Sequence, residues 1–198
     1  MSALLISKVD ALGFRIKALV DQLYREGYVF EYPGEVFPGP APDVADTILR
    51  IEQEAGEVPL ALKIFWLRVG SVNLCGSHAN WLGCDYPDPL VVSPPAHALP
   101  ELEDYLEEPE GSFLIPIAPD VFHKANVSGG MYYNVSVSSR SDDPLLSDDP
   151  LLNDERHGVS LLDYLAIALG WGGFPGLEGA AGHTWPLARL QSAAGGLR

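Results

Sequence analysis

The chain has 198 residues, of which 47% are hydrophobic and 20% are charged, so it can form one domain with a sizeable core. Its formal net charge of −15 argues against nucleic acid or an anionic membrane as a ligand, because both are bound through Lys and Arg. After residue 70 there are 17 acidic residues and only 5 basic ones. This imbalance fits a basic protein partner, and it equally fits a surface that is acidic only for solubility.

The sequence lacks the usual marks of secretion or membrane insertion. Its two cysteines, Cys75 and Cys84, are too few for a disulfide-rich framework. The first ten residues, MSALLISKVD, do not combine a basic start with a long apolar run, as a signal peptide would. No apolar stretch reaches membrane-spanning length, so we expect a cytoplasmic protein.

The N-terminal part begins with a helix signal and continues into a proline-rich segment. Residues 7–26 repeat apolar side chains at helical spacing and are followed by Gly27, which predicts an amphipathic helix that stops there. The apolar face of this helix could form the interface of a homo-oligomer. Residues 28–42 are rich in proline and aromatic side chains, which predicts an irregular segment packed across the surface.

Residues 47–74 predict two consecutive helices and a strand. Apolar residues recur at helical spacing on both sides of a break that contains Gly56 and Pro59. Glycine suits the left-handed end of the first helix, and proline suits the first turn of the second, where its missing N–H is not needed. Gly70 ends the second helix, and the alternation after it predicts a strand at residues 72–74.

The rest of the chain mixes short strands with two further helices. Residues 98–108 predict a short acidic helix, and residues 159–169 predict an apolar one. The hexapeptide SDDPLL occurs twice, at 141–146 and 147–152, and predicts a loop because proline, serine and aspartate favour turns. Strands are predicted at residues 90–92, 112–118, 121–125 and 131–137.

This order of elements predicts an α+β fold, with an antiparallel or mixed sheet and helices packed mainly on one face. No regular alternation of strand and helix supports a doubly wound sheet. Residues 1–176 are expected to form a single domain that includes the N-terminal helix. Residues 177–198 are small, glycine-rich and weakly patterned, and they are expected to form a weakly structured C-terminal tail.

One loop carries residues that could bind a metal or catalyse a reaction. Cys75, His78 and Cys84 place three soft ligands within ten residues, with Asp85 next to them. A structural zinc site takes four ligands in closely spaced pairs, and the second pair is missing here. No nucleophile signature surrounds either cysteine. We therefore predict no enzyme activity, no metal and no cofactor, and the alternative hypothesis is a metal-binding protein or enzyme built on this loop.

Two other features suggest contact with a protein. Trp81 stands in a polar loop, where it would be an interface anchor if exposed and a loop staple if buried. The acidic residues between positions 142 and 155 lack the spacing of a calcium loop, so they form a solvated loop or the rim of a protein-binding surface. The predicted partner-binding residues are Trp81, Asp85, Asp142, Asp143, Asp148 and Asp149.

The helix–break–helix unit and the last apolar helix together carry a family pattern. In the first unit, an apolar-Glu-x3-Gly helix leads to a helix that starts with proline and ends in glycine before a strand. Its positions are Ile48, Ile51, Glu52, Gly56, Pro59, Leu62, Phe65 and Gly70. This unit resembles the N-terminal core of the SUKH superfamily, and the run LLDYLAIALGWGGFPG is similar to the closing helix of many bacterial members. The resemblance spans residues 43–176.

The resemblance implies a compact α+β domain that binds proteins and has no catalytic centre. Many bacterial members are immunity proteins that neutralise a cognate toxin, often a nuclease, and fungal relatives act as regulatory scaffolds. An acidic chain would fit the basic surface of a nuclease, because opposite potentials speed encounter. We therefore expect a non-catalytic binding module of the immunity type, which occludes a basic toxin.

Overall fold

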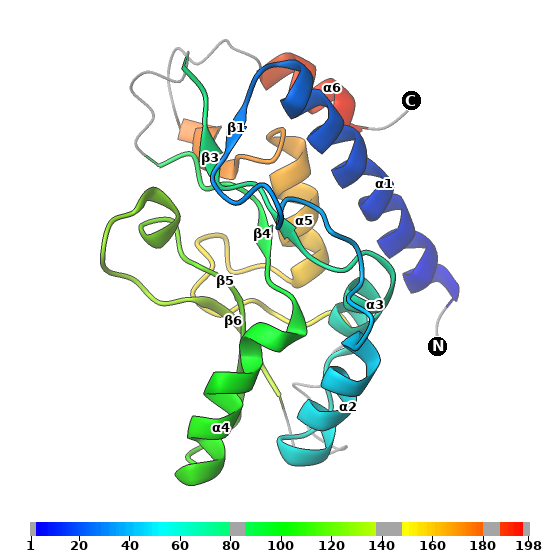
Figure 1. The fold of residues 1–198 in the computed structure, drawn as a ribbon, viewed down its shortest axis with the longest axis vertical. Helices are drawn as coiled ribbons and strands as arrows, with labels where there is room; N and C mark the ends of the chain where they lie inside the picture. The colour runs from blue at the N-terminus through cyan, green and yellow to red at the C-terminus, as the bar shows by residue number, and fades with distance from the viewer. Residues whose placement is uncertain (1–2, 80–85, 138–147, 180–186, 196–198) are drawn as a thin grey trace.

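The computed structural model describes residues 3–79, 86–137, 148–179 and 187–195 (Figure 1). The α-helices in these ranges are α1 (Ala3–Arg25), α2 (Val44–Glu54), α3 (Leu60–Arg68), α4 (Leu99–Glu107), α5 (Leu161–Gly170) and α6 (Leu187–Gly195). The strands are β1 (Val29–Phe30), β2 (Val72–Asn73), β3 (Gly76–Ser77), β4 (Val91–Val92), β5 (Leu114–Ala118) and β6 (Tyr133–Ser136). Short 3-10 helices are η1 (Pro95–Ala98), η2 (His123–Ala125) and η3 (Pro175–Gly179).

The helices predicted from the sequence are confirmed as α1 to α5. The break between α2 and α3 lies where it was predicted, because α2 ends at Glu54 before Gly56 and α3 begins directly after Pro59. None of the helices in the described ranges is both long enough and apolar enough to cross a membrane.

The described strands form three antiparallel pairs instead of one continuous sheet. β1 pairs with β3, β2 with β4, and β5 with β6. The Ser93 N–H donates a 2.7 Å hydrogen bond to the Ile117 carbonyl and so joins the end of β4 to β5. Proline shortens these ladders, since Pro94 closely follows β4 and the register of β5 shifts between Pro116 and Ala118. The predicted α+β class is confirmed.

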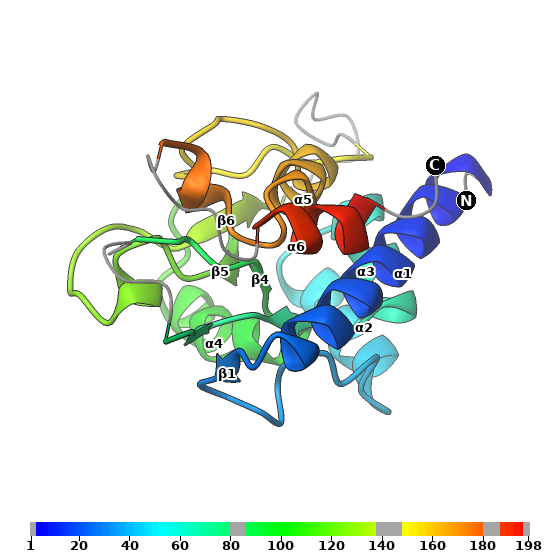
Figure 2. The ribbon, with the colours of Figure 1, turned by 90° about the horizontal axis from the view of Figure 1, so that it is seen from above.

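Helices α1, α3, α5 and α6 pack together beside the strand pairs (Figures 1 and 2). Within this layer α3 packs against α1 and α5, and Leu62, Phe65 and Trp66 on it are completely buried. The indole Nε1 of Trp66 donates a 2.9 Å hydrogen bond to the carbonyl of Ser93. This bond satisfies the one polar atom of a large core side chain and ties the helical layer to the end of β4.

The apolar face of α1 belongs to this core. Val9, Ile16 and Leu19 are completely buried, and α1 packs against α3, α5 and α6. The face that the sequence suggested for a homo-oligomer is therefore covered by other helices of the same chain. The prediction of an interface on that face is wrong, because the partner that buries it is intramolecular.

Residues 121–125, predicted as a strand, instead contain η2. The cause is the side chain of Asp120, whose Oδ1 accepts hydrogen bonds from the N–H of Phe122 at 2.6 Å and of His123 at 3.2 Å. Such bonds favour a turn over an extended backbone. Asn126 then takes a left-handed conformation, with φ at 57°, and ends the turn. The strand prediction for these residues is wrong.

Over 187–195 the structure differs from the prediction of a weakly structured tail, because these residues form α6 along α1 (Figure 2). Leu190 and Ala194, four positions apart, are completely buried. Arg15 donates a hydrogen bond to the Ala194 carbonyl, and Arg189 lies 3.2 Å from the carboxylate of Glu26. The helix depends on these contacts with α1, which a weak local pattern does not reveal. Residues 180–186 and 196–198 of the predicted tail lie outside the described residues.

The docking of α6 predicts a large cost for truncating its central side chain. Leu190→Ala removes a completely buried leucine, so we expect a loss of about 2–5 kcal/mol in the free energy of unfolding. Ser192→Ala on the exposed side of the same helix is the matched control and should change it by less than about 0.5 kcal/mol. Urea denaturation measures both, and equal midpoints for the two variants would contradict the docking of α6.

Candidate functional site

The structure describes only part of the predicted binding site. Asp148 and Asp149 lie within the described residues. Of the other predicted partner-binding and loop residues, those outside the described ranges are Trp81, Cys84, Asp85, Asp142 and Asp143.

Asp149 has a role inside the fold. Its carboxylate accepts hydrogen bonds from the Ser160 hydroxyl at 2.7 Å and from the Leu162 N–H at 3.0 Å, so it holds the first turn of α5. The carbonyl of Asp148 accepts a 2.7 Å bond from the Ala61 N–H and so ties this loop to the first turn of α3. The side chain of Asp148 is exposed and lies on the surface, whereas that of Asp149 is engaged with the fold.

Cys75 and His78 are held by local structure. Burial raises the pKa of the Cys75 thiol to about 11, so the thiol stays protonated near neutral pH and is a poor nucleophile. The Nε2 atom of His78 lies 3.1 Å from the carbonyl of Glu26. Within the described ranges, no three His, Cys, Asp or Glu side chains come together as a metal-binding group. A metal or catalytic site on this loop would have to rely on Cys84 and Asp85, which lie outside those ranges.

A buried ion pair lies on the strand side of the core. Lys124 Nζ contacts Asp88 Oδ1 at 2.7 Å, and both side chains are completely buried. The ammonium group also lies 4.8 Å from the ring centroid of Tyr133. Burial raises the pKa of Tyr133 and of Tyr164, so both phenols stay protonated. Oδ2 of Asp88 has no hydrogen-bond partner among the described residues. The pair holds the segment before β4 against η2 and is closed to solvent.

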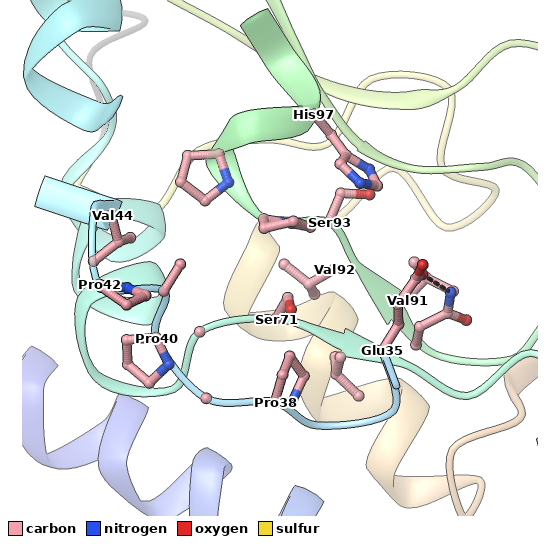
Figure 3. Close-up of a pocket in the computed structure, with 17 residues that line it drawn as sticks. Glu35, Pro38, Pro40, Pro42, Val44, Ser71, Val91, Val92, Ser93 and His97 are labelled. Carbon is pink, nitrogen blue, oxygen red and sulfur yellow. Dashed lines mark hydrogen bonds between the residues drawn. The ribbon is translucent and has the colours of Figure 1, made fainter. Parts of the chain in front are cut away.

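The structure also forms a pocket that the sequence did not predict, and we call it the proline pocket. Its volume is about 380 Å³, and it is lined from three segments: residues 35–44, residues 70–73 at the start of β2, and residues 91–97 across β4 and η1 (Figure 3). Three prolines of the first segment form one side of it. We call residues 38–42 the proline strap; its prolines are Pro38, Pro40 and Pro42.

A close contact between two glycines holds the proline strap in place. Gly70, just after α3, has φ at +91°, which side chains rarely adopt. A Cβ added there would lie 2.2 Å from the backbone carbon and oxygen of Gly39 in the strap. Farther along, the Asn73 N–H donates a 3.2 Å hydrogen bond to the Val36 carbonyl. The strap therefore crosses close to the start of β2, and residues from both sides of this crossing line the pocket.

The polar groups of the proline pocket are few and separated. Oε2 of Glu35 accepts a 3.3 Å hydrogen bond from the side-chain amide of Asn73. Ser71, Ser93 and His97 also line the pocket, and in the described part of the chain no hydrogen bond joins either serine to the histidine. The arrangement therefore lacks the nucleophile–base contact of a hydrolase and offers apolar walls with a few hydrogen-bonding groups, as binding sites do.

An acidic surface follows the pocket in the chain, because η1 leads directly into α4. Leu102 anchors α4 in the core, while the helix projects at one end of the molecule in Figure 1. The only described basic group that pairs with its carboxylates is Arg50 of α2, 3.5 Å from Glu103. We call this region the α4 acidic surface; its exposed members are Glu101, Glu103, Asp104, Glu107, Glu108 and Glu110.

Comparison of this chain with protein-family models, with curated protein sequences and with solved structures finds no match. The features of the molecule that bear on its function are therefore the geometry of the proline pocket and the charge of the α4 acidic surface.

Sequence analysis missed the proline pocket because its walls meet only in three dimensions. The prolines between residues 38 and 42 fall in the segment 28–42 that was predicted to be irregular, and apart from β1 near its start that segment forms no helix or strand. Gly70 was also recognised, as the end of a helix. Nothing local indicated that the two would be in contact. The α4 acidic surface was partly foreseen, since residues 98–108 were predicted to be an acidic helix.

The contact between the strap and Gly70 can be tested with two glycine substitutions. Gly70→Ala and Gly39→Ala both place a side chain at positive φ, which costs about 1–2 kcal/mol each. Only Gly70→Ala also collides with backbone, since nothing lies within 4 Å of a Cβ at Gly39. We expect Gly70→Ala to destabilise the protein by at least about 2 kcal/mol more than Gly39→Ala in urea denaturation. Equal losses in the free energy of unfolding would show that the strap backbone is not in close contact with residue 70.

Proposed function

We propose that this chain is a non-catalytic protein-binding module of the immunity type, which occludes a basic toxin. The single observation that carries the proposal is the α4 acidic surface, where six carboxylates are exposed and one described arginine approaches them. Such a surface attracts a basic partner at long range and disfavours acidic ones. The resemblance to SUKH immunity proteins, noted from the sequence, agrees with this proposal.

The mechanism would be steric and electrostatic occlusion. The α4 acidic surface and the proline pocket are consecutive in the chain through η1, so one partner could cover both. Asp148 and the predicted residues outside the described ranges, Trp81, Asp85, Asp142 and Asp143, are proposed as further contacts. Asp149 is better explained as a cap of α5. A cytoplasmic location is part of the same proposal.

The buried state of Cys75 argues against the alternative of an enzyme that uses this thiol as its nucleophile. A thiol with a pKa near 11 is almost entirely protonated at neutral pH, and Cys75 would supply one of the four groups in that hypothesis. The alternative then depends on His78, Cys84 and Asp85. Near-stoichiometric zinc in the purified protein would favour it over the present proposal.

The proposal can be tested by capture of proteins from lysate of the source organism with three baits. The first is the unchanged chain, and the second carries Glu103→Lys, Asp104→Lys and Glu107→Lys on the α4 acidic surface. The control carries Asp21→Lys, Glu31→Lys and Asp163→Lys, which change the net charge equally at positions away from α4.

We expect the unchanged chain and the control to enrich one basic protein. The captured amount of that protein should be lower by about tenfold or more with the α4 variant at low salt. Mass spectrometry of the captured proteins measures this ratio. Equal retention by all three baits would contradict the assigned surface. Equal loss from both variants would mean that only total charge matters, and it would contradict a specific site.

A further inference from the structure

We propose that the proline pocket receives an arginine side chain of the basic partner. This inference rests on the proposed function and names the group that the pocket would recognise. The volume of about 380 Å³ falls at the small end of the range of ligand pockets, about 300–1,000 Å³, and can hold a single long side chain.

The walls of the pocket suit the aliphatic part of such a side chain. In Figure 3 the prolines of the strap follow one side, between Glu35 at one end and Val44 at the other. Val91 and Val92 of β4, both buried, contribute apolar surface from the strand side. Long cationic side chains pack their methylene groups on apolar surface and keep the charged head near water.

The polar groups favour a cation. Among the described residues that line the pocket, Glu35 is charged and none is Lys or Arg. The Asn73 amide holds Oε2 of Glu35 at 3.3 Å, which orients the carboxylate at the pocket end. The hydroxyls of Ser71 and Ser93 can accept further hydrogen bonds. A ligand head group with several N–H donors matches this set, whereas an anion would be repelled by the carboxylate of Glu35.

Arginine fits this set better than lysine does. The guanidinium group is less strongly hydrated than an ammonium group, and its planar fork can donate two parallel bonds to a carboxylate. Arginine is also enriched among the residues that dominate protein interfaces. Because η1 joins the pocket to α4, neighbouring basic residues of the partner would reach the α4 acidic surface when the arginine occupies the pocket.

The test is a titration of the isotope-labelled full chain, followed by amide NMR shifts. The probes are N-acetyl-arginine amide, its lysine counterpart and its citrulline counterpart, which keeps the shape of arginine without the charge. We expect arginine to shift the amides of Ser71, Asn73 and Val92, and to bind about threefold more tightly than citrulline, as an exposed ion pair allows. Lysine should bind more weakly than arginine.

Two variants locate the charge effect. Glu35→Gln keeps the size of the side chain and should remove the preference for arginine over citrulline. Glu31→Gln, an exposed control outside the pocket, should leave the preference unchanged. The inference is overturned if citrulline or lysine equals arginine, if the shifts lie outside the pocket, or if Glu35→Gln has no effect.

The failure of this inference can be distinguished from the failure of the proposed function. The triple α4 variant should bind the arginine probe as the unchanged chain does, because none of its substitutions lines the pocket. Arginine binding without any captured partner would leave the pocket assigned and the immunity proposal wrong. A captured partner whose binding depends on α4, together with no preference for arginine in the pocket, would support the immunity proposal and overturn the arginine inference.

Discussion

The close approach of two backbones at Gly70 and Gly39 is the constraint on which the pocket and its surroundings depend. Helix α3, with Trp66 in the core, must end there, and β2 must begin two residues later. A side chain at residue 70 would occupy the space of the strap backbone. One glycine therefore ends a helix, starts a strand and allows the proline strap to cross between them. The proline pocket is a consequence of that crossing.

The acidic residues of the chain fall into two structural groups, which the net charge does not distinguish. Asp88, Asp120 and Asp149 are engaged inside the fold, with an ammonium group, with backbone N–H groups and with the start of a helix. The carboxylates of α4 are exposed, and among the described residues Arg50 is the basic group that pairs with them. Only the second group leaves an electrostatic field for a partner, because paired and buried charges are compensated locally.

The sequence predicted helices and strands correctly where local interactions determine them, and incorrectly where contacts between distant residues determine them. Helical spacing, together with Gly56 and Pro59, correctly predicted α2 and α3. The alternating pattern at residues 131–137 likewise predicted β6. The strand expected at 121–125 failed because the Asp120 side chain bonds to the backbone there. Helix α6 was missed because its order depends on α1, at the other end of the chain. The proline pocket was missed for a similar reason, since its walls are far apart in sequence.

The proposed function depends on recognition of a basic partner through the α4 acidic surface. Its most direct test is the association rate of the captured partner with the unchanged chain, measured by stopped flow as ionic strength is raised. We expect the association rate to fall by about tenfold or more from low to physiological salt, while the dissociation rate changes little. An association rate that stays the same over this range would be incompatible with recognition through the α4 acidic surface.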